Sequence, residues 1–243
     1  MAIFPGTKVE PIIEQLMKIS DKKRDMVKEI TLDMANSMKT IAKKCFPKAV
    51  QVTDRFHVQK LALEALQDIR IKHRWDAIDQ ENEHIKRAKE KNRAFVPKEF
   101  SNGDTRKQLL ARSRYLLYKS PNNWTPNQSE RSRILFSQYP DIKLAFELVQ
   151  GLRHIFNTAT TIQVAYTKLA HWYKDVENTG FRAFNTIANT ISLNYRSILN
   201  YFINRSTNAS AESFNAKIKA FRAQFRGVRN TEFFLFRLTQ LFA

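Results

Sequence analysis

The sequence predicts a predominantly helical protein that contains one small parallel α/β unit near its N-terminus. Two short runs rich in β-branched residues, Lys28–Leu32 and Val50–Thr53, flank the helical periodicity of Met34–Cys45. A helix between two strands favours parallel pairing, because the chain must cross over before the second strand begins. Only 5 glycines and 7 prolines occur in 243 residues, which is typical of a chain that is helical over most of its length.

An aspartate follows each predicted strand directly. Asp33 follows the first strand, Asp54 follows the second, and His57 lies three residues further on. In open α/β sheets the carboxyl ends of the strands form the edge where ligands and metals bind. Either aspartate alone is explained as well by an N-cap role at a helix start. The two together, with the Asp-Arg-Phe-His run at 54–57, indicate a functional site.

Helical periodicity covers most of the remaining chain. Pro47 ends the helix between the strands, and a polar loop is expected at 92–103. One helix is predicted to begin with Ser206 or Thr207 as its N-cap. The predicted helices span 9–19, 56–91, 104–120, 127–138, 141–156, 159–177, 181–203, 206–226 and 229–243.

The predicted helix 104–120 mixes basic and aromatic residues. Its basic residues Lys107, Arg112 and Arg114 lie near Tyr115 and Tyr118. Such groups contact nucleic-acid backbones and stack on bases. An ordinary helix that buries its tyrosines explains the pattern equally well, so both interpretations stay open at this point.

The charge balance indicates a polyanionic partner. The chain has 41 Lys and Arg against 23 Asp and Glu, a formal net charge of +18. Nucleic acid is the simplest partner, and an anionic membrane surface is the alternative. No apolar run approaches the roughly 18 residues of a spanning helix. The single cysteine excludes an internal disulfide and fits a reducing cytosol, so we expect a cytoplasmic protein.

One face of the predicted helix 206–226 combines an acid with an amide and three cations. The spacing of 3, 4, 3 and 4 residues places these side chains in one row. A metal ligand at one end with phosphate contacts along the rest would use such a row, and a solvated face is the alternative. The residues of this row are Glu212, Asn215, Lys219, Arg222 and Arg226.

Four motifs together resemble a known family. They are Asp33-Met34, the Pro-Lys-Ala run at 47–49, the run DRFHVQK at 54–60 and the run STNASAESFNAKIK at 206–219. This combination resembles the catalytic core of bacterial insertion-sequence transposases of the DDE type, in the ISL3 group and in the variants found in Bacteroidetes-type genomes. The resemblance spans nearly the whole chain, and its motifs are specific in combination.

The resemblance implies a ribonuclease-H-like core interrupted by an all-helical insertion. Residues 1–65 would be the C-terminal half of the core, 66–203 the insertion, and 204–243 the helix of the catalytic glutamate with a closing helix. Asp33 and Glu212 would be catalytic ligands of Mg²⁺ or Mn²⁺, which clamp the reacting oxygens of phosphodiesters. The partners would be DNA at the element ends and the target, with the protein associated with the bacterial nucleoid.

The resemblance also assigns two further candidate residues. Asp54 and His57 match the D-x-x-H element beside the active site, with a role less defined than that of Asp33. The spacing of the row on the Glu212 helix, and not the resemblance, makes the positions after Glu212 candidates for DNA contact. These are Asn215, Lys219, Arg222 and Arg226.

The sequence departs from the family at its beginning. Residues 1–9 contain no acid, so the first catalytic aspartate has no candidate, and the first three strands of the core have no counterpart. We therefore expect an N-terminally truncated transposase fragment that is inactive alone and that forms homo-oligomers or mixes with full-length transposase. The first alternative is a non-catalytic basic helical DNA-binding protein. A basic helical protein that acts at anionic membranes is a more distant one.

Overall fold

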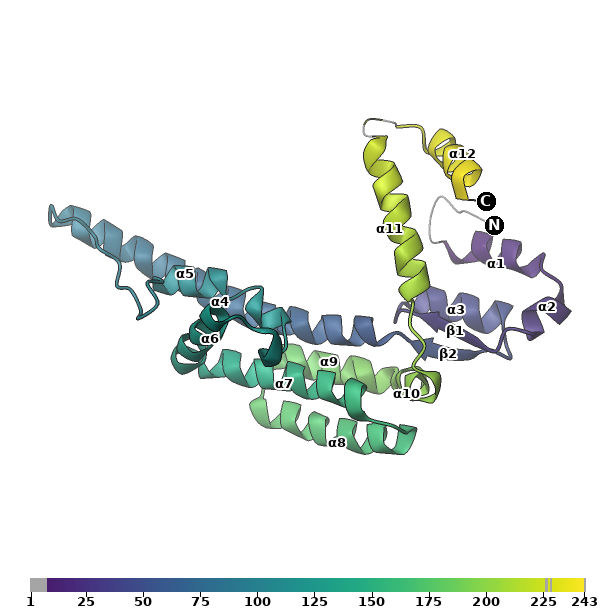
Figure 1. Cartoon of the computed structure of the whole chain (residues 1–243), viewed down its shortest axis with the longest axis horizontal. Helices are drawn as coiled ribbons and strands as arrows, with labels where there is room; N and C mark the ends of the chain where they lie inside the picture. The colour runs from purple at the N-terminus through teal and green to yellow at the C-terminus, as the bar shows by residue number, and fades with distance from the viewer. Residues whose placement is uncertain (1–7, 226, 228, 243) are drawn as a thin grey trace. The chain divides into compact units, whose positions relative to one another are not determined.

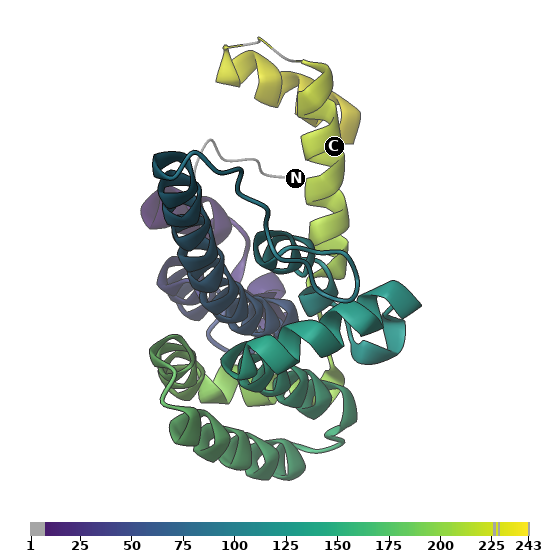
Figure 2. The same cartoon turned by 90° about the vertical axis from the view of Figure 1, so that its left-hand side faces the viewer.

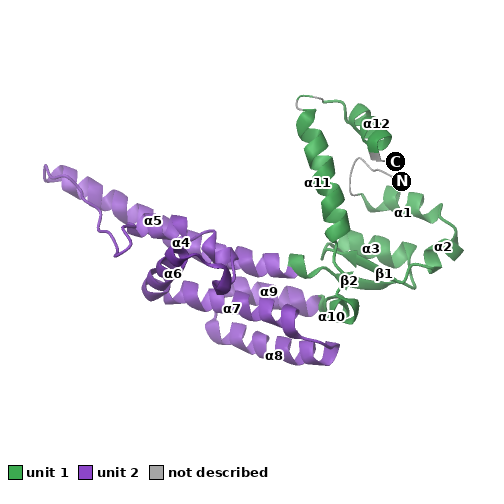
Figure 3. Cartoon of the chain, viewed as in Figure 1, with its two compact units in different colours: residues 1–57, 194–243 green, residues 58–193 purple. Residues whose placement is uncertain are grey.

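The computed structural model describes residues 8–225, 227 and 229–242, and these residues form two compact units. Unit 1 comprises residues 1–57 and 194–243, and unit 2 comprises residues 58–193 (Figure 3). Unit 1 is therefore discontinuous in sequence, since the whole of unit 2 is inserted between its two segments.

Unit 1 contains the predicted parallel sheet. Strands β1 (Glu29–Leu32) and β2 (Val50–Thr53) pair in parallel, and α3 (Asn36–Cys45) connects them (Figure 1). The predicted strand–helix–strand unit is thus confirmed. Cys45 is fully buried on the inner face of α3, and burial raises the pKa of its thiol. Cys45 is therefore a packing residue.

Helices cover the sheet of unit 1 through side-chain contacts as well as apolar packing. The Asn200 side chain donates a hydrogen bond to the Gln51 carbonyl at 2.9 Å, which satisfies a backbone acceptor of β2 that faces away from β1. The hydroxyls of Thr53 and Ser197 lie 2.8 Å apart. The other helices of unit 1 are α1 (Val9–Met17), α2 (Asp21–Asp25), α10 (Tyr195–Asn204), α11 (Ala209–Gln224) and α12 (Thr231–Phe242).

The prediction of one continuous helix over 181–203 is wrong. The structure has two helices there, α9 (Arg182–Leu193) and α10, separated at Asn194. Asn194 leaves the helical region with φ −113° and ψ 11°, and its side chain accepts a hydrogen bond from Lys39 of α3. The break lies at the boundary between the units, so α10 belongs to unit 1 and not to the helical segment predicted as 66–203.

The secondary structure of unit 2 is helical apart from an isolated antiparallel bridge between Glu99 and Thr105, and α6 to α9 supply much of its buried apolar core. Helices α7 and α8 lie side by side (Figures 1 and 2). The indole of Trp172 is buried and donates a hydrogen bond to the Leu148 carbonyl at 2.9 Å, which links α8 to α7. Besides α9, the α-helices here are α4 (Arg55–Glu90, which begins in unit 1), α5 (Arg106–Arg112), α6 (Pro126–Gln138), α7 (Pro140–Thr158) and α8 (Ile162–Thr179).

The predicted helix 104–120 is also shorter than expected. α5 ends at Arg112, and the chain continues into a 3₁₀ turn at Leu116–Tyr118. The Ser113 hydroxyl donates to the Leu109 carbonyl at 2.6 Å, and the Trp124 indole donates to the Leu116 carbonyl at 2.8 Å. After Arg112 the backbone bonds change toward the i→i−3 pattern, as in Arg114 N to the Ala111 carbonyl and Lys119 N to the Leu116 carbonyl, so the α-helix does not continue. Trp124 also stacks on Phe146 in the core.

The part of the chain that the structure describes holds no helix with both the length and the apolar character needed to cross a membrane.

Candidate functional site

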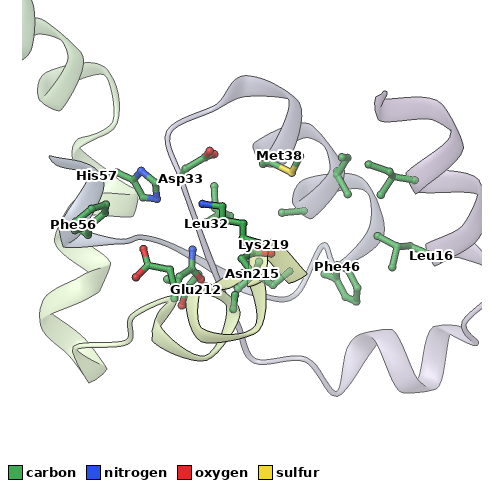
Figure 4. Close-up of a pocket in the computed structure, with 17 residues that line it drawn as sticks. Leu16, Leu32, Asp33, Met38, Phe46, Phe56, His57, Glu212, Asn215 and Lys219 are labelled. Atoms are coloured by element: carbon green, nitrogen blue, oxygen red, sulfur yellow. The ribbon is translucent and has the colours of Figure 1, made fainter. Parts of the chain in front are cut away.

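A pocket of about 840 Å³ in unit 1 brings together residues from both of its sequence segments. Figure 4 shows the polar side chains of Asp33, His57 and Glu212 toward one end of the pocket, and the apolar side chains of Leu16 and Phe46 toward the other. Five of the predicted site residues line this pocket, namely Asp33, His57, Glu212, Asn215 and Lys219.

Asp33 reaches the pocket because it directly follows β1. Its Oδ1 accepts a hydrogen bond from the backbone N–H of Ala35 at 3.0 Å, which turns the chain from the strand toward α3. The N-cap position of α3 is Ala35, so an N-cap role for Asp33 is excluded. The Asp33 side chain is half-buried, and its Oδ2 has no hydrogen-bond partner among the described residues. That oxygen is available to a ligand.

Glu212 lies in the first turn of α11 and is exposed to solvent. The free N–H groups of a helix start stabilise a carboxylate at this position. Asn208 occupies the N-cap position of α11, so the prediction that Ser206 or Thr207 caps the helix is wrong. Asn208 makes no capping hydrogen bond through its side chain.

Asp54 is buried, with 2% of its surface exposed, and both of its oxygens accept backbone hydrogen bonds. Oδ1 accepts from Phe56 N at 2.9 Å, which caps the start of α4. Oδ2 accepts from Asn208 N at 2.8 Å, which ties the start of α11 to the end of β2. The carboxylate therefore joins two helix starts, with one backbone hydrogen bond to each of its oxygens.

His57 completes the polar end of the pocket from the first turn of α4. Its ring meets the ring of Phe56 edge-on, with centroids 5.6 Å apart. The imidazole is partly exposed and lines the same pocket as Asp33 and Glu212. A neutral imidazole in this position can donate one hydrogen bond to a bound group or accept one from it.

The described residues do not form a complete metal site. They contain no group of three His, Cys, Asp or Glu side chains placed to hold one ion. Asp33 and Glu212 offer the hard oxygen donors that Mg²⁺ prefers, whereas Asp54 is buried and accepts a backbone hydrogen bond at each oxygen. The two carboxylates that line the pocket, Asp33 and Glu212, are thus donors of the chemistry that a divalent cation requires.

A second pocket, of about 650 Å³, follows along α11 at its junction with α12. Lys219, Arg222 and Arg229 line it, and the Arg222 guanidinium lies 5.9 Å from the ring centroid of Phe234. The contact of Phe221 with Phe234, at 5.6 Å between centroids, confirms that α12 packs against α11. Arg226 lies outside the described residues.

Sequence reasoning missed two features of this region. Arg229 belongs to the basic pocket although it lies outside the row of side chains on α11. The bond from Asn208 N to Asp54 was missed as well, and only the presence of both residues inside the two family motifs hinted at it. A backbone donor leaves no residue-type signal, so spacing alone could not reveal this contact.

Comparison with known proteins agrees with the resemblance. A model of the DDE transposase family of the ISL3 group, described as "Transposase", matches residues 1–238. Two curated relatives, each named "Transposase for insertion sequence element IS1557", come from Mycobacterium tuberculosis strains CDC 1551 / Oshkosh and ATCC 25618 / H37Rv. Each is 30% identical over 135 residues, which cover 54% of this chain and 29% of the relative. No solved structure matches. The chain belongs to the ISL3 family of DDE transposases.

Proposed function

We propose that this chain supplies part of the catalytic centre of a DNA transposase, in which Asp33 and Glu212 are two of the carboxylates that bind Mg²⁺ or Mn²⁺. The observation that carries the proposal is their meeting in one pocket, although they lie at opposite ends of the sequence. Strand cleavage and transfer at phosphorus use divalent ions held by carboxylates from separate elements. His57 would contact the bound phosphodiester or its unpaired base from the same pocket.

The architecture supports an interrupted ribonuclease-H-like core. In this proposal β1, α3 and β2 are its second half, and α11 carries the catalytic glutamate. The helical unit 2 lies between the two segments of unit 1, as an insertion between the second aspartate and the glutamate would. The aspartates at the carboxyl ends of both strands fit the edge where such folds bind ligands.

We further propose that this chain does not transpose by itself. Two carboxylates hold two divalent cations poorly, because the repulsion between the cations needs compensating negative charge. The described residues offer no third ligand in the pocket. A longer transposase chain that mixes with this one, or a second copy, is one source of the missing carboxylate.

Cleavage of DNA from the element end tests the catalytic proposal. We expect no Mg²⁺-dependent cleavage by the 243-residue chain, and cleavage after the preceding strands of a family member are fused ahead of Phe4. In the fusion, Asp33→Asn or Glu212→Gln should each lower the rate at least about 100-fold, since even groups that only support a metal ligand cost 10–100-fold. Glu232→Gln is the matched control, because Glu232 lies in the first turn of α12 and outside the pocket. Robust Glu212-dependent cleavage by the unfused chain would contradict the proposed deficiency.

The basic side of α11 is proposed to contact DNA phosphates through Lys219 and Arg222, with Asn215 nearer the pocket. Each cation that binds a phosphate releases counterions from the DNA. Lys219→Ala and Arg222→Ala should therefore each reduce by about one the magnitude of the slope of the logarithm of the DNA association constant against the logarithm of the salt concentration. Titrations of labelled duplex DNA between about 50 and 200 mM salt measure this slope. Lys217→Ala is the control, because Lys217 is exposed and lies about 160° around α11 from Lys219. An equal change for Lys217→Ala would remove the assignment of this face.

A second candidate function is a non-catalytic, basic, helical DNA-binding protein. The absence of a three-ligand group among the described residues favours it. This candidate predicts the same salt-dependent DNA binding, but it predicts that the fused chain cleaves nothing and that Glu212→Gln leaves DNA binding and metal binding unchanged.

A further inference from the structure

Unit 2 contains a buried arginine without an acidic partner. Arg70 of α4 is 3% exposed, and its guanidinium donates to the Leu110 carbonyl at 2.8 Å and to the Gln67 side chain at 2.7 Å. Among the described residues no carboxylate forms an ion pair with it. Its positive charge is therefore compensated only by neutral dipoles, and water screens it little.

Two further arginines lie beside Arg70. Arg74 follows one turn later on the same face of α4, and the Gln67 side chain donates to the Arg114 carbonyl at 3.3 Å. Burial lowers the pKa of the Arg70 guanidinium, and the positive charges of Arg74 and Arg114 lower it further. Arg74 and Arg114 are exposed, so two guanidinium groups of this cluster face solvent and the third, that of Arg70, is buried.

The surrounding acids do not neutralise this group. By the 100° step of a helix, Glu64, Asp68, Asp76 and Asp79 lie about 120° or more around α4 from Arg70. The neighbouring cations on α5 do have acidic partners, because Lys107 pairs with Glu81 and Arg112 pairs with Asp104. The local excess of positive charge thus lies at Arg70, Arg74 and Arg114.

An exposed aromatic ring adjoins these arginines. The side chain of Tyr115 is 68% exposed, and the Arg114 guanidinium lies 5.4 Å from its ring centroid. Tyr118 is 38% exposed, whereas Trp124 is held by its hydrogen bond to the Leu116 carbonyl and by stacking on Phe146. Of the aromatic residues in this segment, Tyr115 therefore offers the most open ring face.

We propose that Arg74, Arg114 and Tyr115 form a binding surface on unit 2 for an unpaired stretch of DNA. Guanidinium groups bind phosphate through paired hydrogen bonds, and an exposed ring stacks on an unpaired base. The buried Arg70 adds to the positive potential at this surface without contacting the DNA itself. Membership of a transposase family makes DNA the relevant nucleic acid. The surface is separate from α11 and does not depend on catalysis by unit 1.

Binding of the whole chain to DNA with and without a single-stranded overhang tests this surface. Tyr115→Ala should weaken binding to the overhang DNA about tenfold, or ~1.4 kcal/mol, and leave binding to the fully paired duplex unchanged. Tyr115→Phe keeps the ring and should bind as the parent chain does. Tyr166→Ala is the matched control, because Tyr166 of α8 is 61% exposed. Equal losses for Tyr166→Ala and Tyr115→Ala, or no loss for Tyr115→Ala, would overturn the proposal.

A base analogue in the overhang reports stacking directly. The emission of 2-aminopurine should change on binding to the parent chain and to Tyr115→Phe, and not on saturating binding to Tyr115→Ala. Arg74→Ala and Arg114→Ala should each reduce the salt slope for the overhang by about 0.7, the value for a single strand. The same effects should persist when Lys219 and Arg222 are both replaced by alanine, which separates this surface from the basic side of α11. Loss of all these effects in that background would refute an independent surface.

Discussion

Asp54→Asn should lower the stability of unit 1 by about 2 to 4 kcal/mol, because it removes a charged acceptor and leaves a buried N–H without a partner. The asparagine oxygen can still cap α4 by accepting from Phe56 N. Its amide group, however, places a donor where Asp54 Oδ2 now accepts from Asn208 N. Two donors then face each other in a site that is 2% exposed, and the start of α11 loses its attachment to the end of β2.

Amide hydrogen exchange measured residue by residue distinguishes this effect from general unfolding. Protection of the Asn208 amide should fall strongly in Asp54→Asn, whereas protection of the Phe56 amide should fall only by the global loss of stability. Asp33→Asn is the control, since Asp33 is less buried and accepts a single backbone hydrogen bond, from Ala35. Unchanged protection at Asn208 would show that Asp54 does not hold the start of α11.

The consequence of Asp54→Asn for catalysis follows from the position of Glu212. Glu212 lies one turn after Asn208, and its backbone N–H donates to the Asn208 carbonyl at 2.8 Å. A shift of the helix start therefore moves Glu212 relative to Asp33 across the pocket. Asp54 would in this way act on the proposed metal site through the backbone of α11.

The parallel sheet could be predicted from sequence because its determinants are local. The β-branched runs at 28–32 and 50–53 and the helix between them specify strands, crossover and direction without reference to the rest of the chain. The pocket residues Asp33 and Glu212 could be predicted in another way, from motifs that resemble those of a known family. Spacing alone left both residues with ordinary alternatives.

The two helix predictions that were wrong have causes outside the local sequence. Helical periodicity continues through Asn194, but the chain passes there from unit 2 into unit 1 and the side chain bonds with Lys39, far away in sequence. The helix after residue 104 ends early, where the backbone bonds change to the i→i−3 pattern and the following Trp124 is anchored by stacking on Phe146 of α7. Burial of Arg70 without an acid is likewise a tertiary result, since its position on α4 alone predicts an exposed cation.

Asp104→Asn should destabilise unit 2 by about 3 kcal/mol at neutral pH, near the lower end of the range for breaking a buried ion pair. The Asp104 side chain is fully buried and forms ion pairs with Arg112 and Arg131, the latter at 2.7 Å. The uncharged amide leaves two guanidinium groups without a counter-charge beside the start of α5. The loss stays at the lower end because Arg112 is 53% exposed and regains water.

The loss of stability in Asp104→Asn should depend on pH in a defined direction. Burial of the Asp104 carboxyl raises its pKa, but hydrogen bonds from Arg131 and Arg112 outweigh burial and hold the pKa below its usual value. A lowered pKa in the folded state stabilises the fold fully above the unfolded value of about 3.9, and the stabilisation disappears as the pH falls through the folded pKa. The difference between the parent chain and Asp104→Asn should therefore be constant near neutral pH and shrink below about pH 4.

Tryptophan fluorescence during urea unfolding measures this difference in unit 2 alone, because all 3 tryptophans, Trp75, Trp124 and Trp172, lie within residues 58–193. Asp76→Asn is the control: Asp76 is exposed on α4, and its replacement should change the stability by no more than about 0.5 kcal/mol. A loss in Asp104→Asn that is equally large well below pH 4 would contradict the argument, since the protonated carboxyl and the amide are then both neutral and of similar shape. The ion pairs with Arg112 and Arg131 would in that case contribute less to the fold than the hydrogen bond that Asp104 accepts from Asn102 at 3.0 Å.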